Sequence, residues 1–294
     1  MRKREFLGVL GCAFAIGLVS ATGASALSIT QTTNTLALGN ALGGSGLVIN
    51  SVVLTNGFAS QFGTYTGFTS APVTIGDGVV LSTGQVVQTT AGFNNGVQGS
   101  NTTPSTNTAQ PGTAAFNAYG PGHITNFIQS FDVASLQVNF TLSVPSQVGF
   151  SFIFGSVESP QYTANYTDAF LAFLDGTGSA NQIVFDASNN AVQVGSSFAS
   201  ALTTADTNTA FANPHGLLQL QTFTQNQLSA GVHTITFQIG DVNDHILDSA
   251  VFISNFHAGT GAGGTTPTVP ETSSALLLGA GLAGLGMLRR QFQA

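Results

Sequence analysis

Between Arg4 and Arg289 the chain contains no lysine and no arginine, although aspartate and glutamate occur along the same stretch. A carboxylate buried in a fold made from these residues therefore has no Lys or Arg partner. It must stay solvated, accept hydrogen bonds, pair with a histidine or hold a metal ion. The same absence excludes nucleic-acid binding, which depends on Lys and Arg neutralising phosphates, and it excludes attraction to anionic lipid.

The N-terminus carries the three parts of a secretory signal peptide in order. These parts are the basic residues Arg2, Lys3 and Arg4, an apolar run over residues 6–19, and the small residues Ala24, Ser25 and Ala26. The run is shorter than the roughly 20 apolar residues that a membrane-spanning helix needs. We therefore predict that residues 1–26 direct export through the Sec translocon and that signal peptidase cleaves after Ala26.

Cys12 allows an alternative, because Val9, Leu10 and Gly11 before it are similar to a lipobox. Cleavage there would leave few apolar residues ahead of the cut, so processing after Ala26 is preferred. Since Cys12 is the only cysteine, the mature protein is expected to have no disulfide and no thiol chemistry.

The C-terminus is a second candidate signal, over residues 269–294. Val269, Pro270 and Glu271 precede an apolar run rich in Gly and Leu over residues 273–288, which Arg289 and Arg290 close. Such a run can form a short membrane helix, and the arginine pair would remain in the cytoplasm while everything before it lies outside.

These residues resemble the PEP-CTERM sorting signal, which has the same three parts in the same order. The resemblance implies that an exosortase, a membrane-embedded cysteine protease, recognises the tail and cuts near Val269, Pro270 and Glu271. Thr272 departs from the family, which usually has a second proline there, and this puts the efficiency of processing in question. The alternative is a plain C-terminal anchor that is never cut.

Residues 27–257 have the pattern of an all-β domain. Residues 136–144 alternate between apolar and polar side chains, and Phe150, Phe152 and Phe154 continue the two-residue period after a turn at Pro145 and Ser146. We expect these two strands to form an antiparallel hairpin. Further strands are predicted over residues 47–54, 79–81, 169–174, 182–185, 234–239 and 250–256. The expected fold is a single antiparallel β-sandwich, similar to a jelly roll.

Three segments outside these strands are predicted to form helical turns, a loop and a linker. Residues 36–42 can form one or two helical turns before Gly43 and Gly44. Residues 89–122 are rich in Asn, Thr, Gly, Gln and Pro and predict a long loop. Residues 258–268, rich in Gly and Thr, predict a flexible linker between the domain and the C-terminal signal.

Several segments of the predicted domain resemble the bacterial surface domain called choice-of-anchor L. They are residues 36–46, 78–84, 150–156 with Glu158 and Tyr162, 167–170, 240–244 and 248–253. Members of that family are secreted proteins with varied C-terminal sorting or anchoring signals, so the resemblance implies location more than mechanism. Val157 stands where the family usually has the first of two adjacent acidic residues.

Carboxylates gather near the end of this domain. Asp241, Asp244 and Asp248 lie in one short segment beside Asn243 and His245. Three carboxylates without a basic partner could coordinate Ca²⁺, with Glu158 and Asp168 from the other family-like segments completing the site. Their spacing is not that of an EF-hand, and the alternative is a solvated turn.

No sequence signal for catalysis is present. The chain has no G-x-S-x-G and no H-E-x-x-H motif, and a glycosidase would need a second carboxylate at a fixed distance from Glu158, the only Glu of the domain. We therefore expect no enzymatic activity. Sugar binding stays open, because Tyr65, Tyr119, Tyr162 and Tyr166 could stack on sugar rings.

Together these patterns predict a protein exported to the cell surface or beyond and held briefly in the inner membrane by its C-terminal helix. The resemblance to PEP-CTERM proteins implies a Gram-negative bacterium and association with its exopolysaccharide or biofilm. The expected function is that of a non-catalytic structural or adhesive component of the exopolysaccharide or biofilm matrix. The alternatives are a Ca²⁺-dependent glycan-binding module and, third, a hydrolase. The expected partners are signal peptidase, exosortase and extracellular polysaccharide.

Overall fold

The computed structural model describes residues 27–68, 75–87, 96–98, 103–162, 166–186, 188–195, 209–211, 215–224, 226–259 and 264–267. The predicted signal peptide, with Ala24 and Ala26, and the predicted sorting residues Val269, Pro270, Glu271, Arg289 and Arg290 lie outside this part of the chain.

Within the described residues the first sheet has eight strands. Seven of them lie in the order β1 (Ser28–Gln31), β4 (Phe62–Thr66), β5 (Gly78–Ser82), β12 (Ser249–Gly259), β7 (Gln147–Ser156), β10 (Gly216–Phe223) and β13 (Gly264–Pro267). These neighbours pair antiparallel, whereas the eighth strand, β2 (Gly43–Ser45), pairs parallel with β12.

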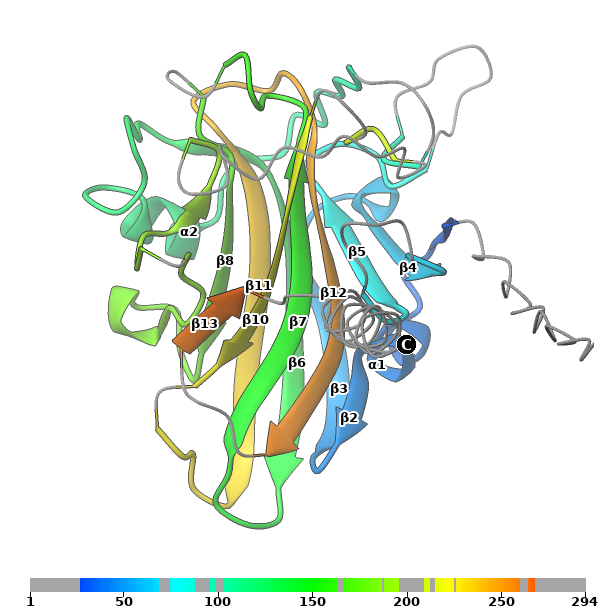
Figure 1. Cartoon of the computed structure of the whole chain (residues 1–294), viewed down its shortest axis with the longest axis vertical. Coiled ribbons are helices and arrows are strands. Elements are labelled where there is room, and N and C mark those ends of the chain that lie inside the picture. The colour runs from blue at the N-terminus through cyan, green and yellow to red at the C-terminus, as the bar shows by residue number, and fades with distance from the viewer. Residues whose placement is uncertain are drawn as a thin grey trace, which may run out of the picture.

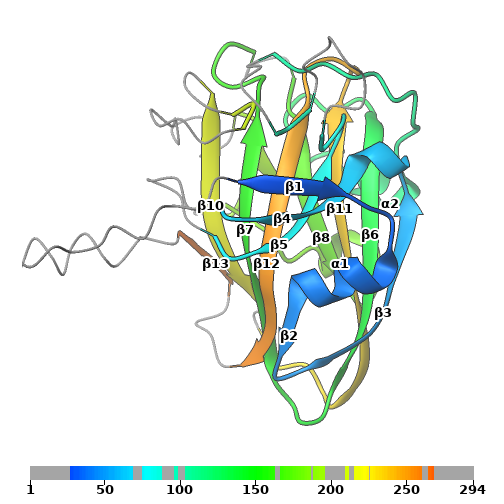
Figure 2. The ribbon, with the colours of Figure 1, turned by 90° about the vertical axis from the view of Figure 1, so that its right-hand side faces the viewer.

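The second sheet has five strands in the described residues, all antiparallel. Their order is β3 (Val48–Asn56), β6 (Ser130–Leu142), β11 (Gly231–Val242), β8 (Ala169–Leu174) and β9 (Val192–Gln193). Figures 1 and 2 show this sheet stacked against the layer that contains β7 and β12. The prediction of an all-β fold with two antiparallel sheets is thereby confirmed.

Phenylalanine side chains fill the space between the two sheets. The ring centroids of Phe150 and Phe237 are 5.0 Å apart, and those of Phe152 and Phe170 are also 5.0 Å apart. All four side chains are fully buried. Large aromatic side chains in edge-to-face and tilted contacts supply the buried apolar area of a core that contains no tryptophan.

The predicted hairpin between the strands around residues 136–144 and 150–154 is wrong. Both segments are strands, but β6 pairs with β3 and β11 in one sheet, whereas β7 pairs with β10 and β12 in the other. The connection at residues 143–146 carries the chain from one sheet to the other, at the lower end of Figure 1. Alternation shows only that a strand has a buried face. It does not distinguish two neighbours in a hairpin from two strands that face each other across a core.

Helix α1 (Thr35–Leu42) closes one open side of the sandwich. The side chain of Asn34 accepts hydrogen bonds from the backbone N–H groups of Leu36 and Ala37, which caps the first turn. Leu38 and Leu42 point into the core, and the helix contacts strands of both sheets. Figure 2 shows α1 between β3 and β12, and the helical turns predicted over residues 36–42 are confirmed.

Other segments differ from the predictions. Helix α2 (Ala114–Tyr119) lies within residues 89–122, which were predicted as a loop. Residues 182–185 make isolated bridges, through Gln182 and Phe185, rather than a strand. The predicted linker over residues 258–268 contains the end of β12 and strand β13, which pairs with β10. Strands β1, β4 and β10 were not predicted, and two single-turn 3₁₀ helices, η1 (Ala59–Gln61) and η2 (Ser179–Asn181), complete the described elements.

No helix in the described ranges is both long enough and apolar enough to cross a membrane.

Candidate functional site

Five of the six segments that carry the family resemblance meet at one end of the sandwich, whereas residues 36–46 lie beside the other end of β12. Strands β5, β7 and β11 end there, at Ser82, Ser156 and Val242, and β12 begins there at Ser249. This is the upper end of Figure 1. It brings together Glu158 after β7, Asp168 before β8, Asp241 within β11 and Asp244 after β11, which we call the carboxylate cluster.

Asp168 lies at the centre of this cluster and joins the two sheets. Its Oδ2 accepts a hydrogen bond of 2.6 Å from the hydroxyl of Ser249, and its Oδ1 accepts one of 3.1 Å from the backbone N–H of Val242. Burial raises the pKa of Asp168, and these two donors oppose the rise only in part.

The carboxylate oxygens of Glu158 and Asp241 have fewer hydrogen-bond partners than those of Asp168. Each residue is 1 % exposed, and the Oε2 of Glu158 and the Oδ1 of Asp241 have no hydrogen-bond partner. Burial raises the pKa of both side chains, and the negative charge of Asp168 raises each further. A hydrogen bond with the side chain of Thr83 opposes this rise at Asp241.

Asp244 is half-buried and lies at the solvent side of the cluster. Its Oδ1 accepts a hydrogen bond of 3.2 Å from the backbone N–H of Ile246. Partial burial raises its pKa, and its charge in turn raises the pKa of Glu158 and of Asp168. Negative charge on one carboxylate of the cluster therefore raises the pKa of its neighbours.

Asp248 was predicted to belong to the same site, but its oxygens already have partners. Thr106 donates to it twice, from the backbone N–H to Oδ1 at 2.7 Å and from the hydroxyl to Oδ2 at 3.1 Å. Burial raises the pKa of Asp248 to about 7. It adjoins the carboxylate cluster and binds the segment around residue 106 to the end of the sandwich.

Sequence reasoning missed Asp132, a buried carboxylate beside Asp248. It accepts hydrogen bonds from the hydroxyl of Thr108 at 2.7 Å and from the backbone N–H of Gln110 at 2.9 Å, and it pairs with the Nδ1 of His245 at 2.8 Å. An aspartate inside an apolar strand of a domain without lysine or arginine was the available signal.

The backbone around these carboxylates is unusual. Asp132, Asn243 and Leu247 have positive φ angles of 48°, 77° and 69°. Non-glycine residues seldom adopt this region, and leucine, which cannot bond its own backbone, least readily of the three. Such strain persists only where the surrounding contacts fix the backbone, and it concentrates at functional sites.

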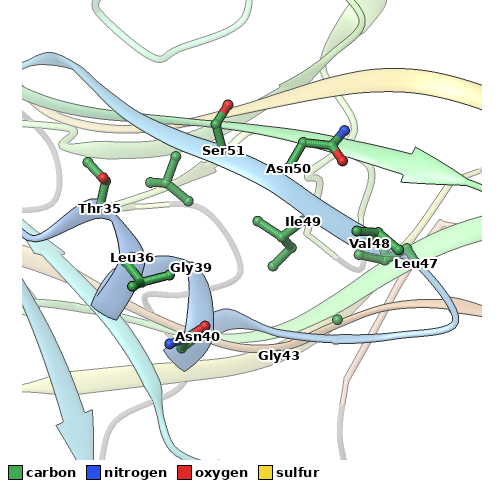
Figure 3. A pocket seen from close by; sticks show the side chains of 12 residues that line it. Thr35, Leu36, Gly39, Asn40, Gly43, Leu47, Val48, Ile49, Asn50 and Ser51 are labelled. Carbon is green, nitrogen blue, oxygen red and sulfur yellow. The ribbon is translucent and has the colours of Figure 1, made fainter.

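A separate groove of about 550 Å³ lies between α1 and β3. Figure 3 shows Leu36 and Asn40 entering it from α1, with Ile49, Asn50 and Ser51 on β3. The groove is thus lined by small apolar and uncharged polar side chains, and it contains none of the predicted site residues.

The tyrosines predicted to stack on sugars divide into two pairs. Tyr65 and Tyr119 are 1 % and 2 % exposed and belong to apolar clusters, so their ring faces cannot meet a ligand. Tyr162 is exposed and Tyr166 partly so, and their rings meet edge to face with centroids 6.4 Å apart. Only this second pair is consistent with the prediction.

The chemistry of the carboxylate cluster is that of oxygen donors alone. Carboxylates and hydroxyls are ligands for hard cations such as Ca²⁺ and Mg²⁺. In the described ranges, no three or more side chains of the His, Cys, Asp and Glu types already have their donor atoms arranged around a common metal position.

Comparison with known families decides what kind of domain this is. The family model described as the choice-of-anchor L domain matches residues 26–257. The chain belongs to the choice-of-anchor L family. A choice-of-anchor domain indicates a protein of the cell surface or the extracellular space. No curated protein and no solved structure matches the chain.

Proposed function

We propose that this choice-of-anchor L protein is exported by a Gram-negative bacterium, sorted by an exosortase, and used as a non-catalytic structural or adhesive component of the exopolysaccharide or biofilm matrix. Three features support the proposal. They are the signal-like N-terminus, the family's association with the cell surface, and a domain whose only formal charges are negative.

The order of features at the C-terminus carries the proposal. Val269, Pro270 and Glu271 come first, an apolar run over residues 273–288 follows, and Arg289 and Arg290 close it. The arginine pair holds the end of the chain in the cytoplasm, which places the motif at the outer face of the inner membrane. A membrane-embedded protease can reach a peptide bond at that depth.

The environment of the carboxylates supports a non-catalytic role. Glu158, Asp168 and Asp241 are at most 1 % exposed, whereas a general acid or base must come within hydrogen-bond distance of its substrate. The side chains that line the groove between α1 and β3 include no carboxylate. A pair of acidic residues facing a bound sugar is therefore not found among these residues.

The sorting proposal can be tested in Gram-negative hosts with and without an exosortase. The double variant Pro270→Ala/Glu271→Ala is compared with the wild type and with the control Thr268→Ala. We expect release of the wild type and of the control from the inner membrane only in the host with exosortase, and retention of the double variant in both hosts. Release of the wild type without exosortase, or equal release of the double variant, would contradict the proposal.

A Ca²⁺-dependent glycan-binding module is the second candidate function. The groove between α1 and β3 favours it, because it offers the amides of Asn40 and Asn50 and the hydroxyl of Ser51 beside apolar surface, and Leu36 is 71 % exposed. Ligand sites combine apolar walls with a few polar groups in this way. A glycan array with Ca²⁺ and with chelator tests this function, with Asn40→Ala as the variant. Hits that this substitution abolishes support it, and an array without hits excludes it.

A further inference from the structure

Three segments bring buried carboxylates together where β7 and β11 end and β8 begins, at the upper end of the sandwich (Figure 1). Glu158 follows β7, Asp168 precedes β8, and Asp241 lies in β11. The geometry points to a divalent-cation site for Ca²⁺, formed by the carboxylates of Glu158, Asp168 and Asp241. The cation would bind these three segments, and thereby both sheets, to one another. This inference does not depend on how the chain is sorted.

The unpartnered oxygens are the first argument. The Oε2 of Glu158 and the Oδ1 of Asp241 are buried and accept no hydrogen bond, although each belongs to a side chain that is 1 % exposed. A buried carboxylate without partners destabilises a fold unless a proton or a cation neutralises it. Two such atoms on interacting side chains favour a bound cation at this place.

The absence of basic partners is the second argument. Residues 27–267 contain no lysine or arginine, so a salt bridge of that kind cannot form. Three histidines of the domain are already engaged. The Nδ1 of His245 pairs with Asp132, that of His233 pairs with Asp175, and that of His215 lies 2.6 Å from the carbonyl of Ser159. A divalent cation can bind to all three carboxylates and offset two of their negative charges at once, whereas each added proton offsets one.

The donor chemistry identifies the cation. The three side chains offer carboxylate oxygens only, with the hydroxyl of Ser249 already donating to Asp168. Ca²⁺ takes 6 to 8 oxygen ligands in flexible geometry, whereas Mg²⁺ demands near-octahedral geometry and usually retains several waters. Extracellular Ca²⁺ modules bind with Kd values of about 10⁻⁴ to 10⁻³ M, which suits an exported protein.

Hydrogen bonds and burial decide which neighbouring carboxylates belong to the proposed site. Asp248 is outside it, because both of its oxygens accept from Thr106. Asp244 is half-buried at the solvent side, where it can supply a further oxygen as the ion enters. Within the described residues no three such side chains surround a common metal position, so the site forms only when the ion binds.

The test is a thermal melt of the purified exported protein, freed of metal with EDTA and then titrated with CaCl₂. We expect one saturable transition, with a rise in Tm of about 5–10 °C when free Ca²⁺ reaches a hundredfold excess over Kd. The variants Glu158→Gln and Asp241→Asn keep the shape of the side chains and remove one charge each. Both should lose the rise in Tm.

Asp77→Asn is the matched control, because it removes one charge from an exposed aspartate on the loop before β5. It should keep the full response to Ca²⁺. Native mass spectrometry of the wild type gives a second readout that needs no variant, with one Ca²⁺ per chain expected. The inference is overturned if the wild type binds no Ca²⁺ and its Tm does not move, or if both cluster variants respond as the wild type does.

Discussion

The hydroxyl of Ser249 donates a hydrogen bond of 2.6 Å to the Oδ2 of Asp168, and this bond joins the first residue of β12 in one sheet to the residue before β8 in the other. Both residues are fully buried. The end of the sandwich is therefore held by polar contacts, in contrast to the phenylalanine core between the sheets.

Replacing Ser249 with alanine should show what this contact contributes. The substitution leaves a buried Asp168 oxygen without its donor, which costs about 1–3 kcal/mol in the free energy of unfolding. Ser249→Ala should lower that free energy in urea unfolding followed by circular dichroism. Ser229→Ala, at an exposed serine, is the control and should change it by less than about 0.5 kcal/mol. Equal stability of the two variants would show that the bond contributes nothing.

Gly84 lies against the carboxylate of Asp248, so closely that a Cβ at this position would overlap with the carboxylate oxygens. Gly84→Ala should therefore displace Asp248 from Thr106 and destabilise the fold by about 1–3 kcal/mol. Gly76→Ala introduces the same methyl group with only ordinary contact to Ser254 and serves as the control. A Gly84→Ala variant as stable as Gly76→Ala would contradict this view of the packing.

Two leucines on α1 allow a matched test of its role. Leu42 is fully buried in the core, whereas Leu36 is 71 % exposed on the same helix. Leu42→Ala should lower the free energy of unfolding by about 2–5 kcal/mol, because it removes buried methyl groups and leaves a cavity. Leu36→Ala should have little effect on stability. If the two variants unfold alike, α1 does not close the core.

His233 makes the stability of the fold depend on pH through its contact with Asp175. Burial lowers the pKa of His233, but its hydrogen bonds to Asp175, at 2.7 Å, and to the carbonyl of Ser229 outweigh burial and raise the pKa overall. The protonated histidine therefore stabilises the fold. This contribution is fully present below the unfolded pKa of about 6.5, and it is lost as the pH rises through the folded pKa.

Asp175→Asn tests this dependence. Asp175 is 40 % exposed, so the loss of stability relative to the wild type should stay below about 1 kcal/mol. It should be largest near pH 5.5 and shrink toward pH 8.5. Urea unfolding across that range measures it, with Leu36→Ala as a control that changes no titratable group. A difference that grows with pH would have the wrong sign.

Seven strands were predictable from sequence, but their partners were not; they are β3, β5, β6, β7, β8, β11 and β12. The alternation of Leu136, Val138 and Phe140 correctly indicated that β6 has one buried face. It could not show that residues 143–146 cross between sheets, because local periodicity is the same in both arrangements. Strand β10 was missed although Leu218, Gln219, Leu220 and Gln221 alternate in the sequence.

The carboxylate cluster was predictable in part. Asp241, Asp244 and Asp248 are close in sequence, and the family resemblance added Glu158 and Asp168. The position of Asp132 depends on the register between β6 and β11, which places Phe131 opposite Asp241. The partner of Asp248 depends on the path of residues 103–113 over the end of the sandwich. Neither the position of Asp132 nor the partner of Asp248 can be derived from the local sequence pattern.

The most direct test of the account as a whole is the intact mass of the protein recovered from the medium or cell surface of a Gram-negative host that carries an exosortase. The account predicts a chain that begins at Leu27 and ends near Pro270 and Glu271, with any attached glycan or lipid visible as added mass. A cytosolic chain that retains both Met1 and Ala294 would contradict it.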